Sequence, residues 1–593
     1  MKLIRYILIA GVILLAIQGC TATPVQEDQE NTSVPSEGTD GTDIDALADK
    51  LPEKPDLTDE IATDVPPHLI YKLLVAEIAG QRGEMALAVK NYLEVAQETH
   101  DPKVAARAAQ VAIYAKDMET ALAASKLWVQ VDPENAEAHR SLASAYIRTA
   151  KPLEAVKHYE KMLELLNDPN NPGYGFSVIS STLAREPDRE LAMSVMDKLL
   201  ETRQDNPYAL FAYSHLAMRQ ARFEMALDAL DKALKVKPDW ASAVILRSRI
   251  LAMQGARGEA LSYLEGVLKG GLSEDIQVGL TYARMLTESR QLEKALEQFE
   301  RLADLAKRDV EINYYAGVLA LQLQKLDEAE KYLQKVLKLG KRLQETNYYL
   351  GQVAEQRKNY DDAINRYSFV RHGEFYFSAQ LRVVSVLAEQ KKFDRSIEHL
   401  QTIRVSSSKQ RLQLILLEGD LLRESKRLTA AKEFYTKVLD SMPNETSVRY
   451  ARALVAEKLG EIDLLESDLQ TILKVEPSNA QVLNALGYTL ADRTNRYEEA
   501  LKYIQRAFEL EPDDAAVVDS LGWVYYRMGD FETSIKHLRR ANELSKDPEI
   551  AAHLGEVLWA SGSKDAAVEI WEKSLKDNPD DEALLEVMKQ YGL

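Results

Sequence analysis

The sequence predicts an all-α protein built as a solenoid of antiparallel helix pairs, and three observations carry this prediction. A small residue near the start of an apolar run returns about every 34 residues through most of the chain. A proline often follows this residue by twelve places, and a glycine often precedes it by twelve. An aromatic residue often stands four places after it. A fixed period of this length is typical of stacked helix–turn–helix repeats.

The repeats are predicted to run from residue 67 to residue 579 as about fifteen helix pairs. The small residue lets two helices approach closely, and the aromatic residue fills the space toward the next pair. No pair buries its apolar face alone, so neighbouring pairs must stack into a superhelix, which we expect to be right-handed. The small-residue positions are Ala88, Ala121, Ala155, Ala192, Ala226, Ala260, Ala295, Ala329, Ala363, Ser396, Ala431, Leu465, Ala500, Ser534 and Ala567.

The prolines and glycines keep the same register. Because proline stops one helix and suits the first turn of the next, we expect these prolines to open the following helix. Two repeats fit worst, one between Asn167 and Pro187 and one around the large residue Leu465. Residues 580–593 are predicted to form a capping helix, which such arrays require. The in-register prolines are Pro133, Pro238, Pro443, Pro477, Pro512 and Pro579, and the glycines are Gly317, Gly351, Gly419, Gly522 and Gly555, with Gly487 one place out.

The first twenty residues have the pattern of a secretory signal. Lys2 and Arg5 precede an apolar run over 6–17, which is too short to span a bilayer comfortably. The run ends in "AIQGC", which resembles the bacterial lipoprotein signal, with Cys20 as the lipidated residue. This resemblance implies a signal peptide over 1–19. Thr21 stands where an aspartate would favour the inner membrane, so the resemblance implies an outer-membrane anchor that faces the periplasm.

Residues 20–66 are predicted to form a lipidated, disordered, acidic tether. Residues 21–66 contain thirteen acidic residues, two lysines and no aromatic residue. Such a segment buries too little apolar surface to order itself. The whole chain carries a net charge of −19, which disfavours nucleic acid as a partner.

The repeats leave no segment of 100 residues or more for a separate catalytic domain. Cys20 is the single cysteine, which excludes an intramolecular disulfide and a cysteine-based zinc site. The nine histidines are dispersed and form no metal-binding motif, and no nucleotide-binding or nucleophile-elbow motif is present. We therefore predict no catalysis, no cofactor, no metal and no small-molecule substrate.

The order of small, aromatic and proline positions resembles the tetratricopeptide repeat. In that family the first helix of each repeat lines a concave groove, which implies a protein-binding surface here. Aromatic residues and arginine are the types that carry binding energy when they are exposed at such a surface. The alternative is that Trp523 and Trp559 pack between repeats. The candidate binding residues are Tyr314, Tyr348, Asn484, Tyr488, Asp519, Trp523, Tyr526, Arg527 and Trp559.

The last repeats, with "LNALGYTLADR", "DSLGWVYYRMGD" and "AAHLGEVLW", resemble a group of proteobacterial repeat lipoproteins. One member binds and activates a periplasmic C-terminal processing protease and presents peptidoglycan hydrolases to it. The resemblance implies the same role here, as a lipid-anchored periplasmic scaffold with those proteins as partners. The alternative is a structural lipoprotein of an envelope export, polysaccharide or pilus-secretin machine. An enzyme with an unrecognised site is the third hypothesis.

Overall fold

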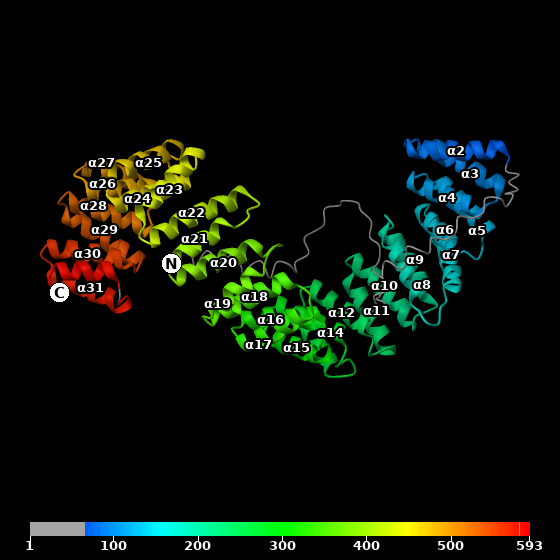
Figure 1. Cartoon of the computed structure of the whole chain (residues 1–593). Helices are drawn as coiled ribbons and strands as arrows, with labels where there is room; N and C mark the ends of the chain where they lie inside the picture. Colours follow the sequence, from blue (N-terminus) through cyan, green and yellow to red (C-terminus); the bar gives the residue numbers. More distant parts are fainter. Residues whose placement is uncertain (1–65, 580) are drawn as a thin grey trace. The chain divides into compact units, whose positions relative to one another are not determined.

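The computed structural model describes residues 66–579 and 581–593, and every regular element within these residues is an α-helix. The predicted all-α repeat fold is confirmed. The chain divides into an N-terminal unit, Met1–Leu323, and a C-terminal unit, Gln324–Leu593. Within each unit, antiparallel helices follow one another side by side (Figure 1). The predicted signal peptide, Cys20 and the tether up to residue 65 lie outside the described residues.

The described helices of the N-terminal unit are α2 to α16, and those of the C-terminal unit are α17 to α32. The first set is α2 (Pro67–Gln81), α3 (Met85–Thr99), α4 (Pro102–Tyr114), α5 (Met118–Val131), α6 (Ala136–Arg148), α7 (Pro152–Leu165), α8 (Tyr174–Leu183), α9 (Arg189–Glu201), α10 (Pro207–Arg219), α11 (Phe223–Val236), α12 (Ala241–Met253), α13 (Arg257–Leu268), α14 (Ile276–Glu288), α15 (Leu292–Leu305) and α16 (Val310–Gln322). The second set is α17 (Leu326–Lys338), α18 (Leu343–Gln356), α19 (Tyr360–Ser368), α20 (Tyr376–Glu389), α21 (Phe393–Gln401), α22 (Ser408–Glu424), α23 (Leu428–Ser441), α24 (Thr446–Leu459), α25 (Ile462–Val475), α26 (Ala480–Arg493), α27 (Tyr497–Leu510), α28 (Ala515–Arg527), α29 (Phe531–Leu544), α30 (Pro548–Ala560), α31 (Lys564–Asp577) and α32 (Glu582–Gln590).

The core of each unit lies between the two helices of a repeat and between successive repeats. Within a repeat the first helix packs on the second, and the second packs on the first helix of the next repeat. The small residue lies in the second helix and is at most 1 % exposed at all fifteen tracked positions. Leu465, the one large residue among them, is as deeply buried as the alanines. Burial at the point of closest helix approach therefore explains the period.

The turn between the two helices of a repeat has its own fixed conformation. Five places before the small residue, the backbone is left-handed in thirteen of the fifteen tracked repeats. The repeats of Ala192 and Ala500 are the exceptions. This conformation costs a residue with a side chain about 1–2 kcal/mol, whereas glycine adopts it freely. The thirteen residues are Gly83, Lys116, Ala150, Ala221, Gly255, Arg290, Gln324, Lys358, Lys391, Lys426, Gly460, Gly529 and Gly562.

The in-register prolines lie in the turns between repeats, so the prediction that they open the next helix is wrong. Pro133 follows Asp132, the C-cap of α5, and precedes Asn135, the N-cap of α6, by two residues. Pro477 and Pro512 have the same place between their helices. The proline ends one helix, and the asparagine or aspartate two places later starts the next, because its side chain accepts hydrogen bonds from the first turn.

The in-register glycines make room for a side chain of the second helix. A methyl group added to Gly555 would come within 3.0 Å of Trp571, which lies four places after the small residue Ala567. The same relation holds between Gly419 and Tyr435. It recurs for Gly351 with Tyr367, Gly487 with Ile504 and Gly522 with Leu538. The glycine and the bulky residue of these repeats are therefore two halves of one contact.

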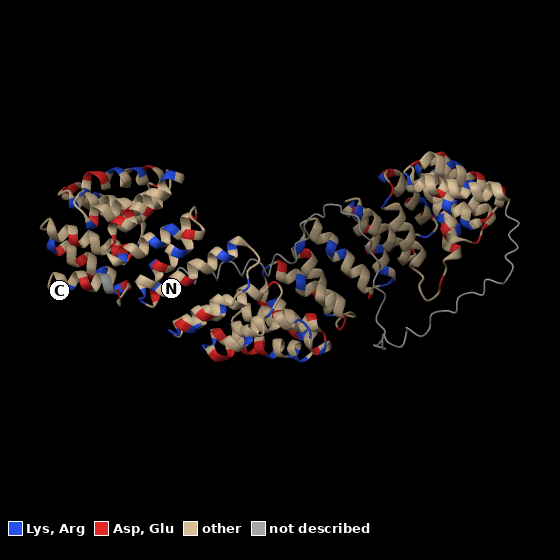
Figure 2. Ribbon diagram, turned by 45° about the horizontal axis from the view of Figure 1, so that its top comes forward, with Lys and Arg blue, Asp and Glu red and all other residues tan. Residues whose placement is uncertain are grey.

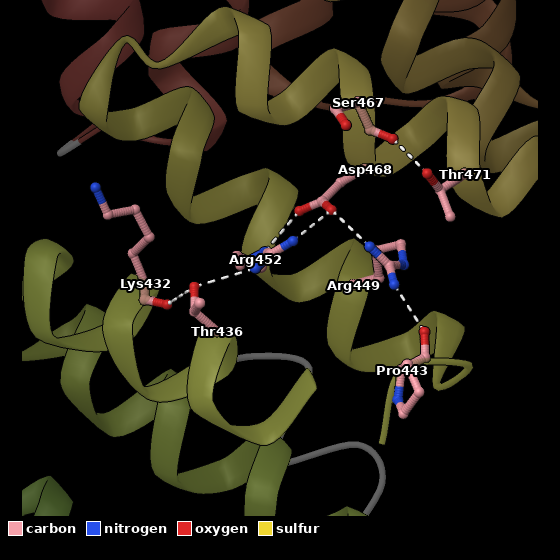
Figure 3. Close-up of polar contacts among 8 residues, drawn as sticks. All are labelled: Lys432, Thr436, Pro443, Arg449, Arg452, Ser467, Asp468 and Thr471. Carbon is pink, nitrogen blue, oxygen red and sulfur yellow. Dashed lines mark hydrogen bonds and ion pairs between the residues drawn. The ribbon is translucent and has the colours of Figure 1, made fainter. Parts of the chain in front are cut away.

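A buried ion-pair network lies in the repeat of Leu465. The Asp468 carboxylate, 2 % exposed, accepts from Arg449 at 3.1 Å and from Arg452 at 2.7 and 2.8 Å (Figure 3). Arg452 also donates to Thr436 Oγ1 and Arg449 donates to the Pro443 carbonyl. The network joins α23, α24 and α25, so polar contacts support the repeat that departs from the small-residue pattern.

The other poorly fitting repeat also contains a buried carboxylate. Glu186 accepts from Arg148 Nε at 2.8 Å and from Ser144 Oγ. Its side chain is 1 % exposed. The helix α8 of this repeat has only ten residues and packs mainly on α10 rather than on its partner α9. The turns over 167–173 that shorten α8 set Tyr174 at its first position.

Candidate protein-binding surfaces

Charged side chains are distributed over both units. Lys and Arg are interspersed with Asp and Glu on the helices, as Figure 2 shows. Such mixed surfaces favour solubility and do not by themselves mark a site. Cavities and the side chains that line them are a better guide to a binding surface.

In the C-terminal unit, four polar or aromatic side chains contact one another across the first helices of three successive repeats. His553 of α30 stacks on the Trp523 ring of α28, with the ring centroids 4.3 Å apart. Its Nδ1 donates to Asp519 Oδ2 at 2.8 Å, and its Nε2 lies 3.4 Å from the Tyr488 hydroxyl of α26. Trp523 donates from Nε1 to Asp492 at 3.3 Å and is 6 % exposed. The tryptophan thus packs between repeats.

The carboxylates around this cluster set the charge of His553. Burial lowers the pKa of His553, but the Asp519 carboxylate beside it, with Glu549 and Glu556 nearby, outweighs burial and raises the pKa above 6.5. Burial, helped by nearby carboxylates that include Asp519, raises the pKa of Tyr488 so far that its hydroxyl stays protonated. The cluster therefore favours the protonated form of the His553 imidazole and keeps the Tyr488 phenol neutral.

A pocket of about 220 Å³ opens beside the cluster. Its lining comes from α24, α25, α26, α28 and the start of α30. The apolar part includes Ala453, Leu469 and Ile550. The polar part is Glu457, Asn484, Tyr488, Thr489, Asp519, Ser520, Asp547, Glu549 and His553. Three predicted residues, Asn484, Tyr488 and Asp519, are thus brought together in one pocket.

The N-terminal unit contains a larger groove of about 980 Å³ along α8, α10, α12 and the start of α14. Tyr174 is 50 % exposed and Met253 is 59 % exposed on its lining. Trp240 contacts Phe211, with ring centroids 4.8 Å apart, and meets Tyr208 edge-on at 5.3 Å. Exposed aromatic and methionine side chains in a groove of this size suit an apolar segment of another protein.

The polar residues of this groove are few. His215 lies at the groove, and burial, with Arg219 nearby, lowers its pKa, so it is neutral at neutral pH. Arg249 is exposed on the lining and Asp275 lies at the end toward α14. Ser177 and Ser181 of α8 supply hydroxyl groups. This groove is therefore mainly aromatic, whereas the pocket of the C-terminal unit is acidic.

Comparison with known proteins agrees with this architecture. Family models described as tetratricopeptide repeat match residues 212–272, 283–342, 450–515 and 520–583, and a second model of the same description matches residues 138–173. The TPR repeat-containing protein PA4667 of Pseudomonas aeruginosa is 33 % identical over 490 residues, which cover 82 % of each chain. The chain belongs to the tetratricopeptide-repeat family. The repeats make it a protein-interaction scaffold.

Two further proteins are similar to shorter parts of this tetratricopeptide-repeat protein. The human cell division cycle protein 16 homolog is 29 % identical over 144 residues, or 22 % of each chain. The crystal structure of the thermophilic TPR protein TTC0263 of Thermus thermophilus is 24 % identical. It aligns over 30 % of this chain and 99 % of that chain with a TM-score of 0.28.

Besides Asp519 and Trp523, which are each 6 % exposed, two further predicted binding residues are buried, although the sequence led us to expect exposed side chains. Tyr314 of α16 is 8 % exposed, and Tyr348 of α18 is 1 % exposed. The Tyr348 ring packs against Tyr367 and Phe375, and burial raises its pKa. At these places the first helix turns its aromatic residue into the stack of repeats, so the side chain has little surface left for a partner.

The three remaining candidates stabilise the last repeats. Arg527 donates to the Asp492 carbonyl at 2.8 Å and lies over the Tyr497 ring at 5.4 Å. Tyr526 is half-buried against Trp523, with the ring centroids 5.2 Å apart. Trp559 is half-buried and packs on Trp571 and on Tyr591 after α32, with ring centroids 6.0 and 5.2 Å apart. Trp559 therefore supports the capping helix.

The aromatic groove of the N-terminal unit was not predicted from the sequence. Its residues Tyr174, Phe211 and Trp240 occupy three different repeats, and none stands at the Leu-Gly position that guided the choice of candidates. The irregular segment before Tyr174 was the available signal, because an insert that breaks a repeat often carries a functional loop. The structure shows that this segment lines the groove through Asn171 and Gly173.

Within residues 66–579 and 581–593, no three His, Cys, Asp or Glu side chains lie close enough together to hold a metal ion. In the same part of the chain, no helix combines the length and apolar character that crossing a bilayer requires.

Proposed function

We propose that this tetratricopeptide-repeat protein is a lipid-anchored scaffold of the bacterial envelope that holds two partners at once. In this proposal it binds and activates a periplasmic C-terminal processing protease and presents peptidoglycan hydrolases to it. It catalyses no reaction itself. Cys20 at the end of the predicted signal would carry the lipid, and the acidic segment to residue 66 would hold the repeats away from the outer membrane.

One observation carries the proposal: each unit has its own candidate surface, and the two surfaces differ in chemistry. The N-terminal unit has an aromatic groove of about 980 Å³ and the C-terminal unit has an acidic pocket of about 220 Å³. Two partners of different character can therefore bind without competition. Holding both on one chain raises the concentration of each near the other, which speeds their encounter without any new contact.

Relatedness to a Pseudomonas aeruginosa protein over 490 residues supports a bacterial setting for this role. The apolar run and Cys20 support export and lipidation, because the single cysteine falls where a lipoprotein signal requires it. The alternative role in an export, polysaccharide or secretin machine would use the same fold with other partners. The identity of the captured proteins separates the two roles.

The test is affinity capture with the full chain. Immobilised protein in detergent is mixed with a periplasmic extract of the source organism, and the retained proteins are identified by mass spectrometry. The proposal predicts a Ser/Lys-type processing protease together with peptidoglycan hydrolases. Retention of export or secretin components in their place would move the chain to the alternative role, and retention of neither class would refute both.

A groove variant shows whether the N-terminal surface holds one partner. We expect the pair Tyr174→Ala and Met253→Ala, which removes two exposed apolar side chains from the groove, to release one class of partner and spare the other. The matched control is the pair Tyr114→Ala and Leu153→Ala, which removes two apolar side chains elsewhere on that unit that are more exposed still. Equal retention by both double variants would exclude this groove.

A further inference from the structure

The pocket of the C-terminal unit has an excess of negative charge. Its lining includes the carboxylates of Glu457, Asp519, Asp547 and Glu549, and its one basic side chain is His553. His553 is already paired with Asp519. Among the described residues, neither Glu457 nor Glu549 forms an ion pair. A ligand that enters this pocket therefore meets two carboxylates, of Glu457 and Glu549, that form no ion pair with a described side chain.

Two acceptors of the lining also lack donors. Asp519 Oδ1 and Asn484 Oδ1 are buried atoms without a hydrogen-bond partner. The Asp519 side chain as a whole is 8 % exposed. The two residues occupy corresponding places in neighbouring repeats, on α28 and α26. Leaving a buried acceptor unpaired is costly, so a ligand rich in N–H donors would recover that cost on binding. This second observation points to a donor as well as to a positive charge.

The size and walls of the pocket limit the ligand. A volume of about 220 Å³ is smaller than the pockets that hold drug-sized molecules, and it suits one long side chain. Ala453, Leu469 and Ile550 offer apolar surface for a methylene stem. The polar groups lie where the end of such a side chain could reach them. An arginine combines this stem with five N–H donors and a permanent charge.

We infer that this pocket binds an arginine side chain presented by a partner protein. The inference deepens the proposed function and rests on it, because it names the chemistry by which one partner is recognised. The guanidinium would donate to Asp519 Oδ1 and Asn484 Oδ1, and its charge would lie among Glu457, Asp519 and Glu549. The polarity is the reverse of a pocket that reads a terminal carboxylate.

The test uses the full chain and three pentapeptides, acetyl-Gly-Gly-Xaa-Gly-Gly-amide, in which Xaa is arginine, citrulline or glutamate. Citrulline has the shape of arginine without its charge. Calorimetric titration at low salt is expected to show about tenfold tighter binding of the arginine peptide than of the citrulline peptide, weakened by added salt, and no binding of the glutamate peptide. Equal binding of the arginine and citrulline peptides, or no binding of either, would overturn the inference.

Variants place the binding in this pocket. The double variant Glu457→Gln and Glu549→Gln removes two carboxylates from the lining. It is expected to lower the affinity for the arginine peptide about tenfold. Both side chains are at least partly exposed, so the fold should persist. The control pair Glu509→Gln and Glu543→Gln removes the same charge from exposed places outside the lining. Unchanged binding in the lining pair, or an equal loss in the control pair, would contradict the assignment.

The two proposals can fail separately. If the full chain still captures the protease and the hydrolases but the lining pair binds the arginine peptide like the unchanged protein, the scaffold stands and the pocket assignment falls. If arginine binds in this pocket but neither class of partner is captured, the pocket is confirmed as an arginine-binding site and the proposed identity of the partners is refuted.

Discussion

Only one oxygen of the Asp519 carboxylate has a hydrogen-bond partner: Oδ2 accepts from His553 Nδ1 at 2.8 Å, while Oδ1 is buried without a donor. The two residues stand in successive repeats, on α28 and α30. Their contact joins the repeats and leaves one oxygen for a ligand. The last repeats therefore contain an ion pair that stabilises the fold and, on the same carboxylate, an acceptor without a donor. The proposed arginine side chain would bind to that acceptor.

The Asp519–His553 pair should make stability depend on pH. Burial opposes the charge on His553, but Asp519, Glu549 and Glu556 raise its pKa above the usual 6.5. A raised pKa stabilises the fold below pH 6.5, and this contribution is lost as pH rises through the pKa of the folded state. Urea unfolding followed by tryptophan fluorescence should therefore show a fall in unfolding free energy above about pH 6.5 that His553→Gln removes.

His537 of α29 is the control for this pH dependence. Burial, with Lys536 and Arg540 nearby, lowers its pKa, so its contribution has the opposite sign and favours the fold as pH rises. His537→Gln should leave the fall above neutral pH in place. If His553→Gln and His537→Gln change the pH profile in the same direction, the Asp519–His553 pair is not its source.

The Gly555–Trp571 contact should make Gly555→Ala destabilising. The added methyl group would come within 3.0 Å of the indole, which is fully buried and cannot move freely. Overpacking of this kind costs about 1–3 kcal/mol. Gly266→Ala in α13 is the control, because open space surrounds Gly266 and alanine favours a helix by about 1 kcal/mol. Equal stability of the two variants in urea unfolding would refute the contact.

The buried carboxylate of Asp468 should be the most sensitive acidic residue of its repeat. Asp468→Asn leaves Arg449 and Arg452, which are 17 % and 13 % exposed, without their counter-charge. Breaking a buried pair in this way costs about 3–5 kcal/mol. Asp463→Asn in the exposed first turn of α25 should cost about 0.3–1 kcal/mol, because it removes one carboxylate from the start of the helix. Hydrogen exchange of α23 to α25 measures the difference, and similar protection in both variants would contradict it.

The left-handed turns should yield stabilising substitutions. Lys391 has a φ of 59°, which costs a residue with a side chain about 1–2 kcal/mol. Glycine avoids this cost but loses more entropy on folding. Lys391→Gly should therefore raise the free energy of unfolding by up to about 1 kcal/mol. Glu398 lies exposed inside the neighbouring helix α21, and Glu398→Gly should destabilise because glycine costs a helix interior about 1 kcal/mol. Thermal unfolding of the two variants gives the comparison, and two shifts of the same sign would count against it.

The sequence predicted the repeats well because one steric requirement recurs in them. Ala88, Ala260 and Ala567 stand at the same closest approach of two helices, so their spacing reports the fold directly. The left-handed turn residue escaped notice because its identity varies. Only five of the thirteen are glycine, and Lys358 or Gln324 at this place gives no visible signal. A backbone requirement that many residue types can meet leaves little trace in one sequence.

The candidate surfaces could be predicted only in part. Asn484, Tyr488 and Asp519 were correctly assigned to the first helices, and the structure places them on one pocket. Position along a helix does not fix exposure, however, because neighbouring repeats decide which side chains they cover. Trp523 is covered by His553 of the next repeat, a contact across 30 residues that no local pattern specifies. The aromatic groove depends on the same long-range packing.

The most direct test of the scaffold is a cleavage assay with purified components. The processing protease and one peptidoglycan hydrolase are held at fixed concentrations, and the rate of hydrolase cleavage is measured as the full chain is added. A scaffold that holds both partners should raise the rate and then lower it once scaffold molecules outnumber the partners, because each partner then occupies a different molecule. A rate that stays unchanged over the whole range would contradict the account, and a rise without the later fall would contradict the presentation of the hydrolase.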